Sequence, residues 1–288
     1  MATPTPNDAN LVTPAHYRSL VEKFLRDINF EMPEFSRDPV LERFLIEDCT
    51  MLVRQQGLDL DIVPDVVSLA AMTSSLIYPF HDQQEKKCIA RYTSYFFLIE
   101  DLGEKFLESN RRFRQNVISQ RRQPPILEAF LDLQADFDEL YGLFSTDMIY
   151  KGLFDFISAS TLEFDIGNQF EVQPTAPFLP DYLRMKTALP EPFVYFVLPK
   201  SSVSDVSHLI DYIQAVPDLM IVANATNDLL SFYKESILGS ERSNFIYQYA
   251  SARQKMPLEA LEAVSKRLRN IAFHFQLPRY RLLELHLF

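Results

Sequence analysis

A row of polar residues next to an apolar helical run constrains this chain more than any other feature. Asn227, Ser231 and Glu235 are spaced four residues apart in the segment Ala225–Glu235, and on an α-helix such residues lie along one face. The preceding run, Asp218–Ala225, is apolar around most of its circumference, which is typical of an interior helix. Polar side chains on an interior helix are costly unless they have partners. The pattern therefore predicts a central helix that carries a functional site.

The three side chains indicate what that site would bind. An amide oxygen, a hydroxyl and a carboxylate are hard oxygen ligands of the kind that Mg²⁺ takes together with waters and a substrate phosphate. A polar stripe that faces solvent would show the same spacing. The apolar run directly upstream, together with the full string from Asn227 to Glu235, favours the metal site over that alternative.

Composition and pattern predict one all-α domain. The chain has 288 residues, close to the upper limit for a single hydrophobic core, and 47% of them are hydrophobic. It has six Gly and lacks the glycine-rich signatures of nucleotide-binding α/β folds. No long β-type alternation or domain linker is visible. We expect a flexible tail at residues 1–14 and one folded domain at 15–288.

The apolar spacing places the helices. We expect helices at about 17–28, 41–56, 62–78, 81–107, 126–143, 148–170, 180–187, 244–252 and 258–275, and a loop at 236–243. The helix at 62–78 is mostly apolar and is expected in the interior. Small and β-branched residues at 158–161 predict a break within the helix at 148–170.

Charge and cysteine content exclude several function classes. The net charge of −11 argues against a nucleic-acid partner and gives no reason to expect association with an anionic membrane. The two cysteines, Cys49 and Cys88, form no CxxC pair, so neither zinc nor a disulfide framework is predicted. A cytoplasmic location is expected because no signal peptide or long apolar span is visible. The basic run Arg111–Arg122 is interpreted as a solvated surface.

A second acidic cluster ends the helix expected at 81–107. Glu100 and Glu104 are one turn apart, and Tyr92, Phe96 and Phe97 lie below Glu100 on the same side. Aromatic rings attract cations through their faces, although a well-filled core gives the same composition. We predict an aromatic pocket closed by this acidic cluster.

The string Asn227-Asp-Leu-Leu-Ser-Phe-Tyr-Lys-Glu235 resembles the second metal-binding motif of class I terpene cyclases, N-D-x-x-S-x-x-x-E. Its ending is especially similar to the fungal trichodiene synthase group. The string Glu100-Asp-Leu-Gly-Glu104 resembles the family's aspartate-rich motif, with Glu100 where the family has Asp. The resemblance implies three Mg²⁺ ions, held by Glu100, Asp101, Glu104, Asn227, Ser231 and Glu235.

The same resemblance implies which residues bind the diphosphate. Arg184, which precedes Asn227 by 43 positions (227 − 184), resembles the family's diphosphate-sensing arginine. Lys234 is similar to a diphosphate-contacting lysine, and Arg279-Tyr280 resembles the Arg-Tyr pair near the family's C-terminus. The distance from Glu235 to Arg279 is shorter than the family shows by about one long helix. Ser160–Phe164 resembles a kinked region whose carbonyls face the substrate cation.

The implied protein is a single-domain class I terpenoid synthase helical bundle. Its implied activity is that of a sesquiterpene cyclase, in which Mg²⁺ triggers loss of diphosphate from farnesyl diphosphate and the cation cyclises against Tyr92, Phe96 and Phe97. The resemblance also implies a homodimer. Two alternatives remain open. A chain-elongating prenyltransferase would be expected to carry a second D-D-x-x-D, and a non-catalytic homologue would bind prenyl diphosphate or act only as a helical scaffold.

Overall fold

The structure, a computed structural model, describes residues 12–34, 36–167, 170, 172–187, 190–203 and 205–275. The predicted Arg279 and Tyr280 therefore lie outside the described residues. Within the described part the chain is α-helical and contains no strand beyond one isolated bridge, between Tyr141 and Pro199. The all-α prediction is confirmed.

Thirteen α-helices are described. They are α1 (Pro14–Asp27), α2 (Pro39–Gln55), α3 (Val63–Ile77), α4 (Gln83–Asp101), α5 (Gly103–Ile118), α6 (Pro125–Leu140), α7 (Leu143–Ile166), α8 (Leu179–Lys186), α9 (Pro190–Tyr195), α10 (Asp205–Ile213), α11 (Val216–Phe232), α12 (Phe245–Ala252) and α13 (Pro257–Phe275). A 3₁₀ turn (η2, Leu60–Ile62) precedes α3, and a π-helical turn (η4, Tyr233–Leu238) follows α11.

Several helices begin where the sequence provides a capping side chain or a proline. Asp82 caps α4 in a reciprocal capping box with Glu85, and the side chains of Thr13, Asp38 and Asn244 accept hydrogen bonds from first-turn backbone N–H groups. Proline occupies one of the first two positions of α1, α2, α3, α6, α8 and α11. Proline suits these positions because it lacks only an N–H that would be unpaired there.

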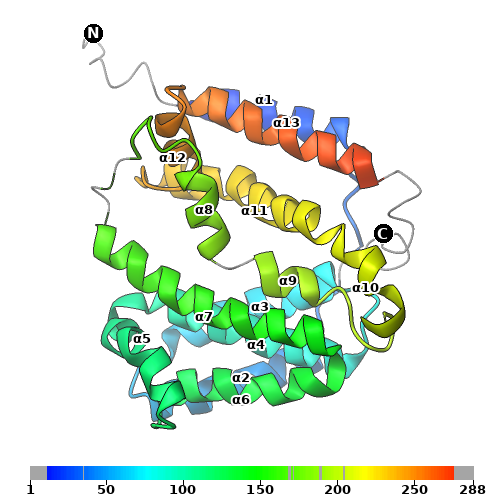
Figure 1. The fold of residues 1–288 in the computed structure, drawn as a ribbon, viewed down its shortest axis with the longest axis vertical. Helices are drawn as coiled ribbons and strands as arrows, with labels where there is room; N and C mark the ends of the chain where they lie inside the picture. The colour runs from blue at the N-terminus through cyan, green and yellow to red at the C-terminus, as the bar shows by residue number, and fades with distance from the viewer. Residues whose placement is uncertain are drawn as a thin grey trace.

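Helix α11 connects two apolar cores. The larger core lies among α2, α3, α4, α6, α7 and α9, in the lower part of Figure 1, and takes Val216, Leu219 and Met220 from the start of α11. The smaller core lies with α1, α12 and α13 in the upper part, and takes Ala225, Leu229 and Phe232 from its end. A helix that packs on two sides must be apolar around its circumference. The predicted central position of this helix is confirmed.

Two helix predictions were wrong. The helix expected at 81–107 ends at Asp101, because Leu102 leaves the helical conformation and Gly103 starts α5. The helix that contains 158–161 runs without interruption to Ile166. There the hydroxyls of Ser160 and Thr161 donate to the carbonyls of Phe156 and Ile157, both at 2.9 Å, so these residues are accommodated within the helix.

Helix α3 is less interior than its composition suggested. It buries Val66, Val67 and Ala70 but exposes Leu69 and Ile77. The segment Leu60–Ile77 is long and apolar enough to cross a membrane by length and composition alone, and one third of it is buried. Core helices of soluble proteins meet the same criterion, so this segment gives only weak evidence for a membrane.

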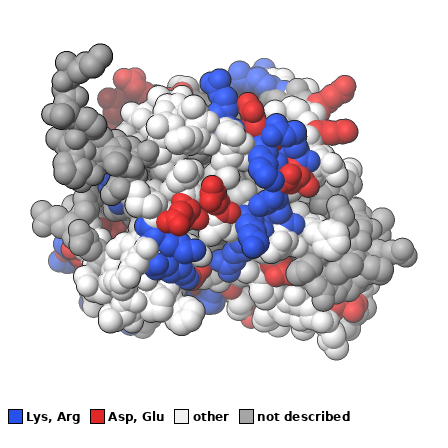
Figure 2. All heavy atoms as spheres, turned by 90° about the horizontal axis from the view of Figure 1, so that it is seen from above, with Lys and Arg blue, Asp and Glu red and all other residues white. Residues whose placement is uncertain are grey.

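The outer face of α1 and α13 mixes both charges. Seen from above in Figure 2, Lys and Arg side chains lie beside Asp and Glu side chains. Asp27 at the end of α1 accepts hydrogen bonds from Lys23 and from Arg269 of α13, so an ion-pair network ties the two helices together. In the basic run at residues 111–122, Arg111 pairs with Asp165 and Arg112 pairs with Glu108, and all four residues are exposed.

Candidate active site

One cavity of about 500 Å³ opens between α4, α7, α8, α11 and the start of α12. Its apolar part includes Phe96, Phe156, Ala159, Leu162 and Ile166. Its polar part includes Glu100, Glu163, Arg184, Asn227, Asp228, Glu235 and Glu241. A cavity of this size, apolar on one side and polar on the other, suits a small ligand with one charged end.

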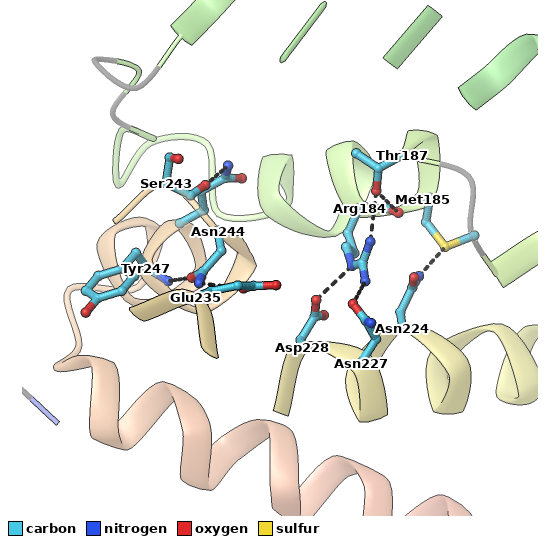
Figure 3. Close-up of polar contacts among 11 residues, drawn as sticks. Arg184, Met185, Thr187, Asn224, Asn227, Asp228, Glu235, Ser243, Asn244 and Tyr247 are labelled. Carbon is cyan, nitrogen blue, oxygen red and sulfur yellow. Dashed lines mark hydrogen bonds and ion pairs between the residues drawn. The ribbon is translucent and has the colours of Figure 1, made fainter. Parts of the chain in front are cut away.

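Arg184 of α8 makes the central polar contacts of the cavity (Figure 3). Its Nη2 donates to Asn227 Oδ1 at 2.9 Å, and its Nη1 donates to Thr187 Oγ1 at 3.0 Å. Its Nε lies 2.9 Å from Asp228 Oδ1 in an ion pair. This arrangement aims a planar guanidinium at the polar end of the cavity, where it can bind phosphate oxygens.

Glu235 is held by the segment that follows α11. The turn Tyr233–Leu238 is π-helical, with more residues per turn than an α-helix. Glu235 therefore does not lie on the α-helical face that its four-residue spacing from Ser231 predicts. Asn244 Nδ2 donates to Glu235 Oε2 at 3.1 Å and to Ser236 Oγ at 2.9 Å. Asn227 and Glu235 both line the cavity, whereas Ser231 and Lys234 are not among its described lining residues.

The acidic motif at the end of α4 is divided by the helix break. Glu100, in the last turn of α4, lines the cavity. Asp101 and Glu104 are exposed and do not line it, and the chain turns at Leu102 between these two residues. Glu100 and Glu104 therefore do not lie one turn apart on a single helix, as the sequence had suggested. Burial raises the pKa of Asp101, and the Lys234 ammonium opposes that shift only in part.

Of the predicted aromatic residues, the structure brings Phe96 to the cavity. Tyr92 is buried below it in the large core, where its ring contacts Phe130 at 4.6 Å and Phe196 at 5.1 Å between centroids. Phe97 contacts Phe96 edge-on but is not among the described lining residues. Phe156, which the sequence analysis did not select, takes part instead, with its ring centroid 4.1 Å from that of Phe96.

Three carboxylates of the cavity were also missed: Glu163 on α7, Asp228 on α11, and Glu241 in the segment after η4. Asp228 follows Asn227 directly within the recognised string. Glu163 stands seven positions after Phe156 and therefore on the same face of α7, so spacing links it to the cavity only once Phe156 is placed there. Glu241 carries no such signal, since it lies outside any regular helix.

The electrostatics of the cavity favour a cation. Burial, with smaller contributions from the charges of Asp101 and Glu163, raises the pKa of Glu100 to about 7. Although Glu100 is open to water in the cavity, protein surrounds it on most sides. Burial raises the pKa of Asp228 to about 6 against the opposing effect of Arg184. Carboxylates that share a site in this way are stabilised when a bound cation neutralises them.

The ligand atoms suit Mg²⁺. Glu100, Glu235 and Asn227 offer hard oxygens, and Asp228 Oδ2 is buried without a hydrogen-bond partner. Among the described residues no three His, Cys, Asp or Glu side chains are close enough to hold a metal by themselves. Mg²⁺ commonly binds through one or two carboxylates plus waters and substrate phosphates, so a complete protein cage is not required.

Comparison with known proteins identifies the family. No family model matches the chain. The (E)-beta farnesene synthase of Metarhizium brunneum is 30% identical over 246 residues, which cover 85% of this chain and 74% of that protein. Terpene synthase BipA of Cochliobolus sativus is 26% identical over 264 residues, which cover 90% of this chain and 78% of that protein. Monoterpene synthase 25 of Postia placenta is 27% identical over 235 residues, which cover 81% of this chain and 68% of that protein.

A solved structure shares the fold of this chain. The crystal structure of linalool/nerolidol synthase from Streptomyces clavuligerus superposes with a TM-score of 0.63 at 14% sequence identity, over 88% of this chain and 87% of that one. The helical bundle is therefore a class I terpenoid synthase fold, as predicted. With this fold, and with a relative 30% identical over most of both chains, the protein belongs to the terpene synthases, lyases that act on prenyl diphosphates.

Proposed function

We propose that this terpene synthase binds farnesyl diphosphate with Mg²⁺, removes the diphosphate and cyclises the resulting allylic cation. One observation carries the proposal: a single cavity joins the Arg184–Asn227–Asp228 cluster to a floor made by Phe96 and Phe156. A diphosphate would bind at the polar end, and an isoprenoid chain would extend over the rings. The relatives include both a farnesene synthase and a monoterpene synthase by name, so chain length and cyclisation belong to the proposal.

Arg184 would bind the leaving group. Its guanidinium is shared between Asn227 and Asp228, and a diphosphate can compete for the same N–H groups with more negative charge. Because the guanidinium stays protonated, it stabilises the negative charge that develops on diphosphate as the C–O bond breaks. If Arg184 donates to the diphosphate in place of Asn227, the amide oxygen of Asn227 becomes available to a metal.

The metal ligands follow from the lining of the cavity. We assign Glu100, Asn227 and Glu235 first, because all three line it. Bound Mg²⁺ supplies Lewis-acid stabilisation of the departing diphosphate. Three ions, and the further ligands Asp101, Glu104 and Ser231, rest on the family resemblance, as do diphosphate contacts by Lys234, Arg279 and Tyr280. The ending Ser231-Phe-Tyr-Lys-Glu235 supports placement near the trichodiene synthase group.

The apolar floor would control the cation. The rings of Phe96 and Phe156 lie 4.1 Å apart between centroids and line the apolar part of the cavity. Aromatic faces attract positive charge. An apolar lining also keeps out water, which would otherwise quench the cation as an alcohol.

The proposal is tested by incubating the full chain with farnesyl diphosphate and Mg²⁺ and identifying products by gas chromatography with mass spectrometry. Geranyl diphosphate and an EDTA-treated sample run in parallel. We expect cyclic C15 products that require Mg²⁺ and that Glu235→Gln reduces by roughly 10²-fold or more, the loss typical of removing one group that stabilises developing charge. Glu262→Gln, an exposed change on α13, is the matched control.

The outcomes separate the parts of the proposal. Preference for geranyl diphosphate would contradict the assigned chain length. Acyclic products or farnesol alone would contradict cyclisation, and undiminished turnover in EDTA would contradict the metal requirement. Full activity in Glu235→Gln would remove Glu235 from the site.

A further inference from the structure

Helices α4 and α7 each contribute one ring and one carboxylate to the cavity. On α4, Glu100 stands four positions after Phe96, and on α7, Glu163 stands seven positions after Phe156. These spacings keep each pair on one helix face, with the carboxylates about 6 and 10 Å further along the helix axes. The two rings are in contact below, at 4.1 Å between centroids, and all four residues line the cavity. Both carboxylates line the cavity beyond the two rings, and the charge of Glu163 acts on Glu100.

Both carboxylates lie where negative charge is unfavourable. Glu100 is in the last turn of α4, which ends at Asp101, and Glu163 is in the last turn of α7, which ends at Ile166. The C-terminus of a helix carries partial negative charge and favours cations over anions. Among the described residues, neither carboxylate forms a hydrogen bond or salt bridge. Asp165, two positions from Glu163 on the same helix, is paired with Arg111 at 2.6 Å.

A nearby cation does not neutralise the pair. Arg184 is the positive charge that acts on both Glu100 and Glu163. Its Nη1 and Nη2 atoms, however, donate to Thr187 and Asn227, and its Nε atom lies 2.9 Å from Asp228 Oδ1. A further buried acceptor also faces the cavity: the Asp228 side chain is 9% exposed, and its Oδ2 has no hydrogen-bond partner. The described residues thus leave several oxygens without a positive partner.

We propose that Glu163 is a further metal-binding residue of this site, and that it binds the Mg²⁺ on the Glu100 side of the diphosphate. The second carboxylate on that side would then come from α7 and not from the motif Glu100–Glu104, whose Asp101 and Glu104 do not line the cavity. This inference rests on the proposed function. It assigns to the site a residue that lies outside both metal motifs of the sequence.

Calorimetric titration of the full chain with inorganic pyrophosphate, over a series of Mg²⁺ concentrations and in EDTA, tests the inference without turnover. The variants are Glu163→Gln and, as a matched control on the same helix, Asp165→Asn. Each replaces one carboxylate by an amide of almost the same shape, and circular dichroism confirms that the helices are retained. Glu235→Gln reports on the proposed metal site itself.

We expect Glu163→Gln to raise the Mg²⁺ concentration needed for tight pyrophosphate binding by roughly tenfold or more, the range seen when carboxylates that support a metal are lost. Asp165→Asn should match the wild type. In EDTA the affinity of Glu163→Gln for pyrophosphate should be unchanged or higher, because a negative charge has been removed from an anion site.

Three results would overturn the inference. If Glu163→Gln keeps the wild-type Mg²⁺ requirement while Glu235→Gln does not, Glu163 is not a ligand and the proposed function stands. If Glu163→Gln weakens pyrophosphate binding equally with and without Mg²⁺, it acts by positioning Arg184. If the wild type itself shows no Mg²⁺-dependent binding of pyrophosphate, the inference and the proposed function fail together.

Discussion

The Nη2 atom of Arg184 lies 2.9 Å from the Oδ1 atom of Asn227, so the candidate diphosphate ligand on α8 is bonded to a candidate metal ligand on α11. Diphosphate and Mg²⁺ would each compete for an atom that this bond occupies. Binding of diphosphate to Arg184 would release the Asn227 oxygen toward Mg²⁺. The contact therefore couples the two binding events, and by linkage each should strengthen the other.

Replacement of Arg184 by Lys tests the geometry of the guanidinium separately from its charge. Lys keeps the positive charge but cannot bond Asn227, Thr187 and a phosphate in the same planar fork. We expect kcat/KM for the prenyl diphosphate to fall by roughly 10²- to 10³-fold, as when one preorganised donor is lost from a charged transition state. Arg111→Lys, at an exposed ion pair, is the control. Wild-type kinetics in Arg184→Lys would show that charge alone suffices.

The position of α8 should depend on Asp181. This carboxylate accepts from Arg253 at 3.0 Å and from Arg267 at 3.1 Å, and so ties α8 to the end of α12 and to α13. The Arg253 guanidinium also lies 3.8 Å from the centroid of the Tyr249 ring and is mostly buried. Asp181→Asn therefore removes the carboxylate partner of a largely buried guanidinium. We expect a loss of about 1–2 kcal/mol in the free energy of unfolding.

Thermal unfolding measures the Asp181 effect, with Asp132→Asn at an exposed position of α6 as the control. Because α8 carries Arg184, Asp181→Asn should also raise KM for the prenyl diphosphate, an effect that a purely local loss of stability would not produce. An unchanged KM would show that α8 keeps its position without these ion pairs.

Close packing of α7 against α9 should make Gly152 intolerant of a side chain. A Cβ atom at Gly152 would lie 2.4 Å from Cγ and 2.7 Å from Cδ of Pro192. The proline ring cannot rotate away, so Gly152→Ala must push the two helices apart. We expect a destabilisation of about 1–3 kcal/mol, the usual consequence of overpacking. Gly103→Ala is the matched control, since a Cβ atom at Gly103 would meet nothing within 4 Å.

Gly103→Ala should be neutral or stabilising by roughly 0.4–1 kcal/mol, because Ala restricts the unfolded chain more than Gly does. Thermal and urea unfolding of both variants make the comparison. Equal stabilities for the two variants would mean that α7 and α9 separate without a measurable penalty.

The two thiols should be unreactive in the folded protein. Burial raises the pKa of Cys49 to about 12, and burial also raises the pKa of Cys88. The unfolded chain would release these protons near pH 9, so the stability that the protonated thiols support is complete below that pH and is lost as the pH rises toward 12. At pH 8 iodoacetamide should modify neither cysteine in the native state and both in urea, as counted by mass spectrometry. Full labelling of a protein that keeps its helicity would contradict their burial.

The sequence by itself determined the fold class and the polar end of the site. Helical spacing, proline at helix starts and capping residues such as Asp38 and Asp82 act over a few residues, so most helices could be located without tertiary information. Helix α5 was not predicted as a separate element, and the short helices α9 and α10 were not predicted because a few turns give little periodic signal. The position of Arg184 relative to Asn227 came from family resemblance, and the structure joins the two with a hydrogen bond.

Tertiary structure decided which side chains share the cavity. A one-residue break at Leu102 separates Glu100 from Glu104, and a π-helical turn changes the path of the chain at Glu235. Glu163 and Phe156 enter the site because α7 packs beside α4 there, at a distance in sequence over which local patterns carry no information. Helix spacing fixes which residues share a face, but only the packing of helices against one another decides which faces meet around a cavity.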